Sequence, residues 1–222
     1  MATYSESYGF EFPRQSSAEE IANTATHGVG LALATIGALA LVATALARGS
    51  SVEALVVVTV YGASLIAVYA ASTCSHAVQE PRRKRLYRIV DQAVIYLLIA
   101  GTYSPFISTY APPGRKWLLM AVVWALALSG FLSKVVLKHR IEVVALANYI
   151  FLGWLPAMAM VDALPFEGFN WVVVGGALYS LGAVFLVFDQ RVPYFHALWH
   201  VFVLGASISH FGVIMHITLY VA

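Results

Sequence analysis

The chain has 222 residues, of which 60% are hydrophobic and only 11% are charged, with a formal net charge of +2. Soluble domains carry about 25% charged residues, so this composition predicts a membrane protein and excludes an ordinary soluble domain. A net charge this small gives no reason to expect a nucleic-acid partner. The single cysteine, Cys74, excludes an internal disulfide.

Residues 1–23 are polar, and we expect a partly amphipathic lead-in there without the features of a cleaved signal peptide. Ser16 and Ser17 are followed three residues later by Glu19 and Glu20, which predicts a capped helix N-terminus. A membrane-spanning helix needs about 20 apolar residues. Seven segments meet this need, at 24–47, 52–75, 88–109, 115–133, 141–161, 168–188 and 195–220. The short links predict an all-α bundle of antiparallel neighbours, with residues 1–222 forming a single seven-helix membrane domain.

Lysine and arginine are concentrated in the links at one end of this predicted bundle. Ten lie on the side of the N-terminus: Arg14, Arg82, Arg83, Lys84, Arg85, Arg88, Lys134, Lys138, Arg140 and Arg191. Three lie on the other side: Arg48, Arg115 and Lys116. The excess of basic residues in cytoplasmic loops therefore predicts a cytoplasmic N-terminus and, with seven spans, an outside C-terminus. We expect a multi-pass protein of the cell (inner or cytoplasmic) membrane.

Two histidines lie at the start of the last span, in the stretch YFHALWH, residues 194–200. His196 and His200 are four residues apart, so they share one helix face, one turn apart. Two imidazoles at this spacing can bind one Zn²⁺ ion. The alternative is that both histidines form hydrogen bonds with neighbouring helices, and the pair alone does not decide between the two.

Further polar residues fall at the same depth. Ser72 and His76 share a face at the end of the second span, and Asp91 lies at the start of the third. On the predicted topology these residues and the histidine pair all lie near the cytoplasmic surface. Ionisable groups inside membrane spans are costly and commonly functional, and three imidazoles with an open fourth position are typical of catalytic zinc. The alternative for Asp91 is an ion pair with Arg88 or a favourable position at a helix N-terminus.

A polar stripe enters the first span at the same end. Glu20, Asn23 and His27 are spaced three and four residues apart and share a helix face. We expect them to support the metal site, while contact with a lipid head group or simple bonding between helices are the alternatives. His210 lies about 15 Å beyond His200 along the helix, so it either lines the same cavity more deeply or is a buried, hydrogen-bonded histidine.

The ordered set Ser72-x-x-x-His76, Asp91 and His196-x-x-x-His200 resembles the progestin and adipoQ receptor (PAQR) family, and in particular its bacterial hemolysin III-like branch. The segments DQAVIYLLIAGTYSPF, residues 91–106, and NTATHGVG, residues 23–30, look like the third and first spans of that branch. The resemblance implies seven membrane helices, a cytoplasmic N-terminus and an intramembrane zinc. By position, His76, His196 and His200 would be the ligands, with Ser72 and Asp91 holding the water at the metal.

These observations lead to the hypothesis of a zinc-dependent hydrolase of a lipid amide or ester, similar to the ceramidases, with a membrane lipid as substrate. Asp91 would be the general base and Ser72 would orient the water or stabilise the oxyanion. One rival is a non-enzymatic membrane homeostasis or receptor-like protein with structural zinc. Another is a hemolysin-type pore. The oligomeric state stays open.

Overall fold

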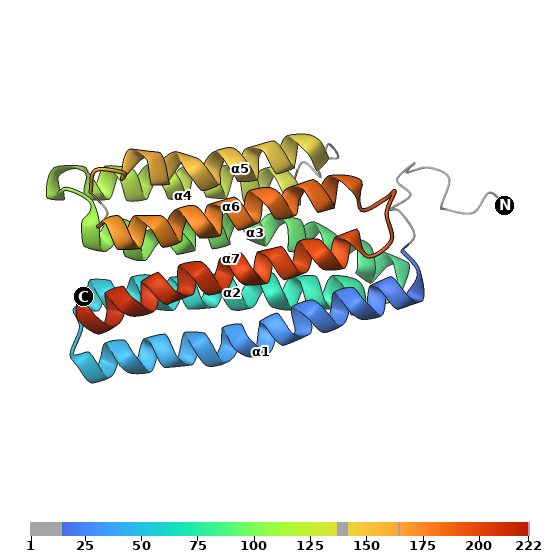
Figure 1. Cartoon of the computed structure of the whole chain (residues 1–222), viewed down its shortest axis with the longest axis horizontal. Coiled ribbons are helices and arrows are strands. Elements are labelled where there is room, and N and C mark those ends of the chain that lie inside the picture. Colours follow the sequence, from blue (N-terminus) through green and yellow to red (C-terminus); the bar gives the residue numbers. More distant parts are fainter. Residues whose placement is uncertain (1–14, 137–141, 164, 222) are drawn as a thin grey trace.

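The structure, a computed structural model, describes residues 15–136, 142–163 and 165–221. Within these ranges seven helices run side by side along one long axis, and no strand occurs (Figure 1). The helices are α1 (Ser17–Arg48), α2 (Val52–Ala77), α3 (Pro81–Tyr110), α4 (Pro113–Val135), α5 (Glu142–Ala159), α6 (Phe166–Phe188) and α7 (Phe195–Tyr220). The first turn of α1 and the last turn of α7 lie at opposite ends of the bundle (Figure 1).

Six of these helices, all except α5, are long and apolar enough to cross a membrane. The part of α5 whose side chains the structure describes contributes a shorter apolar helix, Leu146–Ala159. The described residues therefore form an all-helical, multi-pass membrane protein, whereas the count of seven spans and the side on which each terminus lies stay predictions. Residues 1–14 and 137–141, which include Arg14, Lys138 and Arg140 of the charge count, lie outside the described residues.

The start of α1 confirms the predicted capping box. The Ser16 hydroxyl accepts the backbone N–H of Glu19 at 3.3 Å, and the Glu19 carboxylate accepts the backbone N–H of Ser16 at 2.9 Å. This reciprocal pair satisfies two backbone donors that would otherwise have no partner at the helix end. The helix therefore begins at Ser17, several residues before the predicted span at 24.

The start of α3 differs from the prediction. The predicted span begins at 88, but the helix begins at Pro81, because the Glu80 carboxylate accepts the backbone N–H groups of Arg82 and Arg83 at 2.9 and 2.8 Å. These bonds hold the pKa of the exposed Glu80 carboxyl below its usual value. The basic stretch after Glu80 is therefore helical, which places Lys84 and Arg88 one turn apart on a single face.

The predicted placement of Lys134 in the link after the fourth span, which was expected to end at 133, is wrong. Helix α4 continues to Val135, and the Lys134 side chain is only 4% exposed. Its Nζ donates to Gln92 Oε1 on α3 at 2.9 Å, which gives a buried ammonium group a partner. Lys134 is therefore part of the contact between α3 and α4.

A close approach between α1 and α2 places the first two helices against the interior. A Cβ atom added at Gly30 would lie 2.4 Å from the Tyr69 ring, so no larger residue fits without displacing that ring. Tyr69 is buried and meets the edge of the His27 ring, with the ring centroids 5.1 Å apart. Gly30 thereby sets the distance at which the polar stripe of α1 faces α2.

Candidate metal centre

Three histidines meet at one end of the bundle. His76 lies in the last turn of α2, while His196 and His200 lie in the first two turns of α7. One ring nitrogen from each lies within 4.8 Å of the others. The ring centroids are 4.9 Å apart for His76 and His196, 5.1 Å for His76 and His200, and 4.7 Å for His196 and His200. The three predicted ligands thus form a compact triangle, and their role as ligands stays a prediction.

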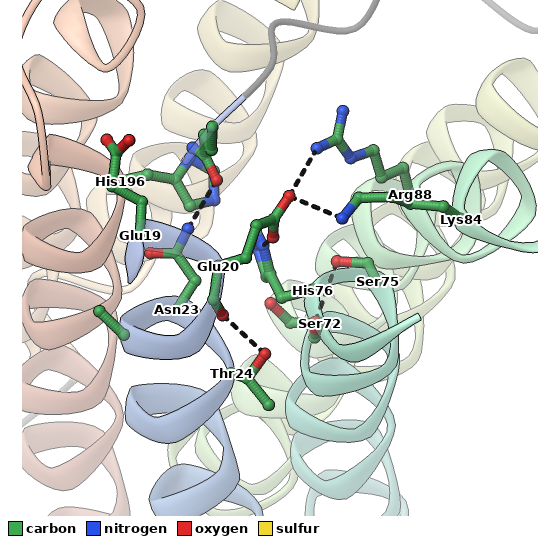
Figure 2. A network of polar contacts seen from close by, with 12 residues as sticks. Glu19, Glu20, Asn23, Thr24, Ser72, Ser75, His76, Lys84, Arg88 and His196 are labelled. Atoms are coloured by element: carbon green, nitrogen blue, oxygen red, sulfur yellow. Dashed lines mark hydrogen bonds and ion pairs between the residues drawn. The ribbon is translucent and has the colours of Figure 1, made fainter. Parts of the chain in front are cut away.

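Glu20 fixes the orientation of the first of these rings. Its Oε2 accepts a hydrogen bond from His76 Nδ1 at 2.8 Å, and its Oε1 accepts one from Lys84 Nζ at 2.6 Å. Arg88 lies 3.5 Å from the same Oε1 atom. Figure 2 shows the Glu20 carboxylate between His76 on one side and the two cations on the other. The two cations compensate the buried carboxylate, which can hold the Nδ1 proton of His76.

Asp189 has the same relation to His196. Its Oδ2 accepts a hydrogen bond from His196 Nδ1 at 2.7 Å. Asp189 is the first residue after α6, so the link between α6 and α7 supplies this contact. Asp189 was not predicted from the sequence. Its position only seven residues before the predicted ligand His196 is the signal that could have indicated it.

Thr26 holds the third ring from α1. Its Oγ1 lies 3.1 Å from His200 Nδ1, and also 2.9 Å from the Ala22 carbonyl and 3.0 Å from the Asn23 carbonyl. A hydroxyl has one proton, and a carbonyl can only accept, so this proton goes to the carbonyls. With its own proton directed to a carbonyl, the Thr26 hydroxyl can accept a hydrogen bond from His200 Nδ1, which is the assignment we adopt. No sequence spacing indicated this contact, because Thr26 and His200 are 174 residues apart.

The start of α7 is held by the first turn of α1. The backbone N–H of Tyr194 donates to Glu19 Oε1 at 3.1 Å. Tyr194 has a φ of 64°, in the left-handed region that side-chain-bearing residues seldom adopt. The bond from Glu19 helps to hold this turn, after which α7 starts at Phe195, one residue before His196.

These contacts give all three histidines the same arrangement. Each Nδ1 donates to an oxygen, so each Nε2 is left with a lone pair. A metal-ligating histidine almost always donates its other ring N–H in this way. Three neutral imidazoles suit Zn²⁺ and other borderline divalent ions, with a fourth position open. The residues present therefore fit a metal centre.

Asp91 and Ser72 line the same cavity as this triangle, and their catalytic roles stay predictions. Asp91 accepts a hydrogen bond from the Ser75 hydroxyl at 3.2 Å and also interacts with Ser72. Asp91, Ser72 and Ser75 line one cavity together with the three histidines. Ser75, which the sequence analysis did not select, is thus a direct partner of the carboxylate.

Asn23 and His27, the remaining predicted supporting residues, are buried beside His200. His27 stacks on the His200 ring, with centroids 3.5 Å apart and planes inclined by 20°. Asn23 Nδ2 donates to Gln15 Oε1 at 2.6 Å. Of the predicted stripe, Glu20 bonds His76 and His27 lines the cavity, while the Asn23 side chain bonds Gln15.

The cavity has a volume of about 310 Å³ and extends from the histidine triangle into the apolar interior of the bundle. Its far part is lined by residues such as Tyr103, Trp154 and His210. His210 lines the cavity, and its Nε2 also bonds the Val172 carbonyl at 3.2 Å, so both alternatives considered for this residue hold. The arrangement joins a polar end to a long apolar chamber.

A family model described as haemolysin-III related matches residues 15–211. The chain belongs to the haemolysin-III related family. Hemolysin-3 of Bacillus cereus is 39% identical over 204 residues, which cover 90% of this chain and 92% of that protein. The hemolysin-3 homolog of Bacillus subtilis is 36% identical over 196 residues, covering 87% and 91%.

More distant similarity extends to animals. The human monocyte to macrophage differentiation factor is 28% identical over 157 residues, covering 68% of this chain and 66% of that protein. This relative is of the PAQR type, so the resemblance to the PAQR family and its hemolysin III-like branch is confirmed. Membership gives the family and the membrane character, while the activity has to be argued from the site.

Proposed function

We propose that the protein is a zinc-dependent hydrolase of a lipid amide or ester in the cell membrane. The observation that carries this proposal is the common arrangement of His76, His196 and His200, whose Nδ1 atoms are all engaged by oxygens. A purely structural role would not require an acidic side chain at an open coordination position. Asp91 lines the same cavity as the three histidines, and this shared lining supports a catalytic centre over a structural one.

The proposed reaction assigns a proton-transfer role to Asp91. The water oxygen attacks the carbonyl carbon, the C–N or C–O bond breaks, and Asp91 carries the water proton to the leaving amine or alcohol. Ser75 and Ser72 hold the carboxylate, and Ser72 orients the water or the developing oxyanion. A zinc ion held by the three histidines would supply a Lewis acid that polarises the carbonyl and makes water reactive near neutral pH.

The shape of the cavity supports a lipid as substrate. A chamber that begins at the polar cluster and continues between apolar residues can take a head-group linkage at one end and an acyl chain along its length. Large apolar side chains are exposed on the outer faces of the helices, so lipids would surround the protein. A membrane lipid is therefore the expected occupant of the cavity. The bond hydrolysed would be the one nearest the histidines.

The proposal is tested by hydrolysis of defined probes by the purified, zinc-loaded protein. N-lauroylsphingosine serves as the amide probe and 1,2-dilauroylglycerol as the ester probe, with released laurate measured by mass spectrometry. We expect release from at least one probe, and a loss of about 100-fold or more in Asp91→Asn, with zinc content unchanged. Asp162→Asn, an exposed aspartate outside the cavity, is the matched control and should keep full activity.

Two results would reject the hydrolase. The first is no laurate release by zinc-loaded protein from either probe. The second is equal release by wild type and Asp91→Asn. If the protein is instead a non-enzymatic homeostasis protein, cellular lipid composition will be the same with Asp91→Asn as with wild type. If it is a pore, purified protein will carry ions across liposomes.

A further inference from the structure

His27 is a buried histidine whose two ring nitrogens have no hydrogen-bond partner among the described residues. The residue is only 3% exposed, yet it lines the cavity next to His200. It is not one of the three histidines whose ring nitrogens form the triangle. A buried polar group without a partner costs free energy, so these nitrogens call for a group that the protein itself does not supply.

A second buried polar atom without a hydrogen-bond partner among the described residues lies one turn earlier on α1. Asn23 is 0% exposed, and its Oδ1 has no hydrogen-bond partner in the described part of the chain. Asn23 and His27 share the face of α1 that is turned to the metal centre. Two independent side chains on this face thus offer unused hydrogen-bonding capacity.

The balance of donors and acceptors indicates which chemistry would match them. A neutral imidazole has one N–H donor and one acceptor nitrogen, and the Asn23 oxygen is a second acceptor. The pair therefore offers one donor and two acceptors. Carboxylates and phosphate diesters can only accept, whereas a hydroxyl both donates and accepts.

We propose that His27, with Asn23 beside it, forms a subsite for a hydroxyl group of the bound lipid, next to the metal centre. The subsite favours a neutral head group with a free hydroxyl. It disfavours an anionic head group, and also one whose hydroxyl is replaced by a methoxy group. This proposal deepens the proposed function and depends on it only for the position of the lipid in the cavity. His27 also supports His200 through the ring stack, so its two tasks have to be separated in the test.

The test uses two amide probes that differ only at the hydroxyl, N-(2-hydroxyethyl)dodecanamide and N-(2-methoxyethyl)dodecanamide. Binding is measured with zinc-loaded protein in phosphatidylcholine nanodiscs, in the Asp91→Asn background so that neither probe is consumed. We expect the hydroxyl probe to bind about fivefold more tightly, the size expected for one net hydrogen bond. In His27→Phe, which keeps a flat ring against His200, this preference should disappear while the zinc content is retained.

His216→Phe is the matched control, because His216 is an exposed histidine of α7 that does not line the cavity. It should keep the fivefold preference. Equal binding of the two probes by the parent protein, failure of both probes to bind, or an unchanged preference in His27→Phe would overturn the subsite. A hydroxyl preference without any lipid hydrolysis would support the subsite and reject the hydrolase. Lipid hydrolysis without the hydroxyl preference would support the hydrolase and reject the subsite.

Discussion

Glu20 and His76, which are 56 residues apart in the sequence, are joined by a hydrogen bond of 2.8 Å between Oε2 and Nδ1. The same carboxylate bonds Lys84, so one side chain of α1 links α2 to α3 at the histidine triangle. This relationship implies that the metal centre depends on a residue that would not itself touch the metal.

Glu20→Gln should weaken zinc binding by about 10- to 100-fold, the usual effect of changing a group that orients a ligating histidine. The amide accepts a weaker hydrogen bond from His76 and leaves Lys84 and Arg88 without their counter-charge. Competition with a zinc chelator measures the change. Glu53→Gln is the control, since Glu53 pairs with Lys116 away from the cavity. Equal zinc affinity in the two variants would contradict this role of Glu20.

Asp189→Asn should also lower zinc affinity, because His196 would lose its charged hydrogen-bond acceptor. The expected loss is again about 10- to 100-fold. The same chelator competition, with Asp162→Asn as the comparison, measures it. An unaltered affinity would show that the link between α6 and α7 does not take part in the site.

Thr26→Val removes the oxygen that accepts from His200 Nδ1 while keeping the size of the side chain. We expect a loss of zinc affinity that Thr26→Ser restores, because serine keeps the hydroxyl. Thr35→Val provides the matched comparison on the same helix, since the Thr35 hydroxyl bonds only the carbonyl four residues before it and is exposed. A defect in both valine variants, or in Thr26→Ser as well, would point to a general disturbance of α1.

Gly30→Ala should lower the unfolding temperature, because the new Cβ atom would lie 2.4 Å from the Tyr69 ring. Overpacking of this kind costs about 1–3 kcal/mol. Gly28→Ala, two residues earlier, meets no atom within 4 Å and should be neutral or slightly stabilising. Thermal unfolding in detergent compares the two variants. A lower temperature for Gly28→Ala than for Gly30→Ala would contradict the packing described for α1 and α2.

The sequence predicted the helices and the three histidines because both leave local patterns. Apolar runs of membrane length mark the spans, and spacing of four residues pairs Ser72 with His76 and His196 with His200. The capped start of α1 was predicted, but the start of α3 was placed too late, because its polar first turn, capped by Glu80, is not part of an apolar run. A search restricted to hydropathy cannot extend a helix into such residues.

The partners of the histidines were harder to predict. Glu20 was selected because it continues a polar stripe, but its contact with His76 depends on how α1 packs against α2. Thr26 gives no such signal, since a threonine in a membrane helix commonly bonds its own backbone. Its second role appears only when α7 lies beside α1. Contacts between helices that are far apart in the sequence are therefore the part of the site that sequence periodicity cannot predict.

The central claim is that the histidine triangle binds a metal ion, and metal content measures this directly. Protein purified in mild detergent without chelators is compared by mass spectrometry with the His196→Ala, His200→Ala double variant and with His216→Ala. We predict about one zinc per chain in the wild type and in His216→Ala, and none in the double variant. Wild-type protein without metal, or a double variant that keeps it, would contradict the account.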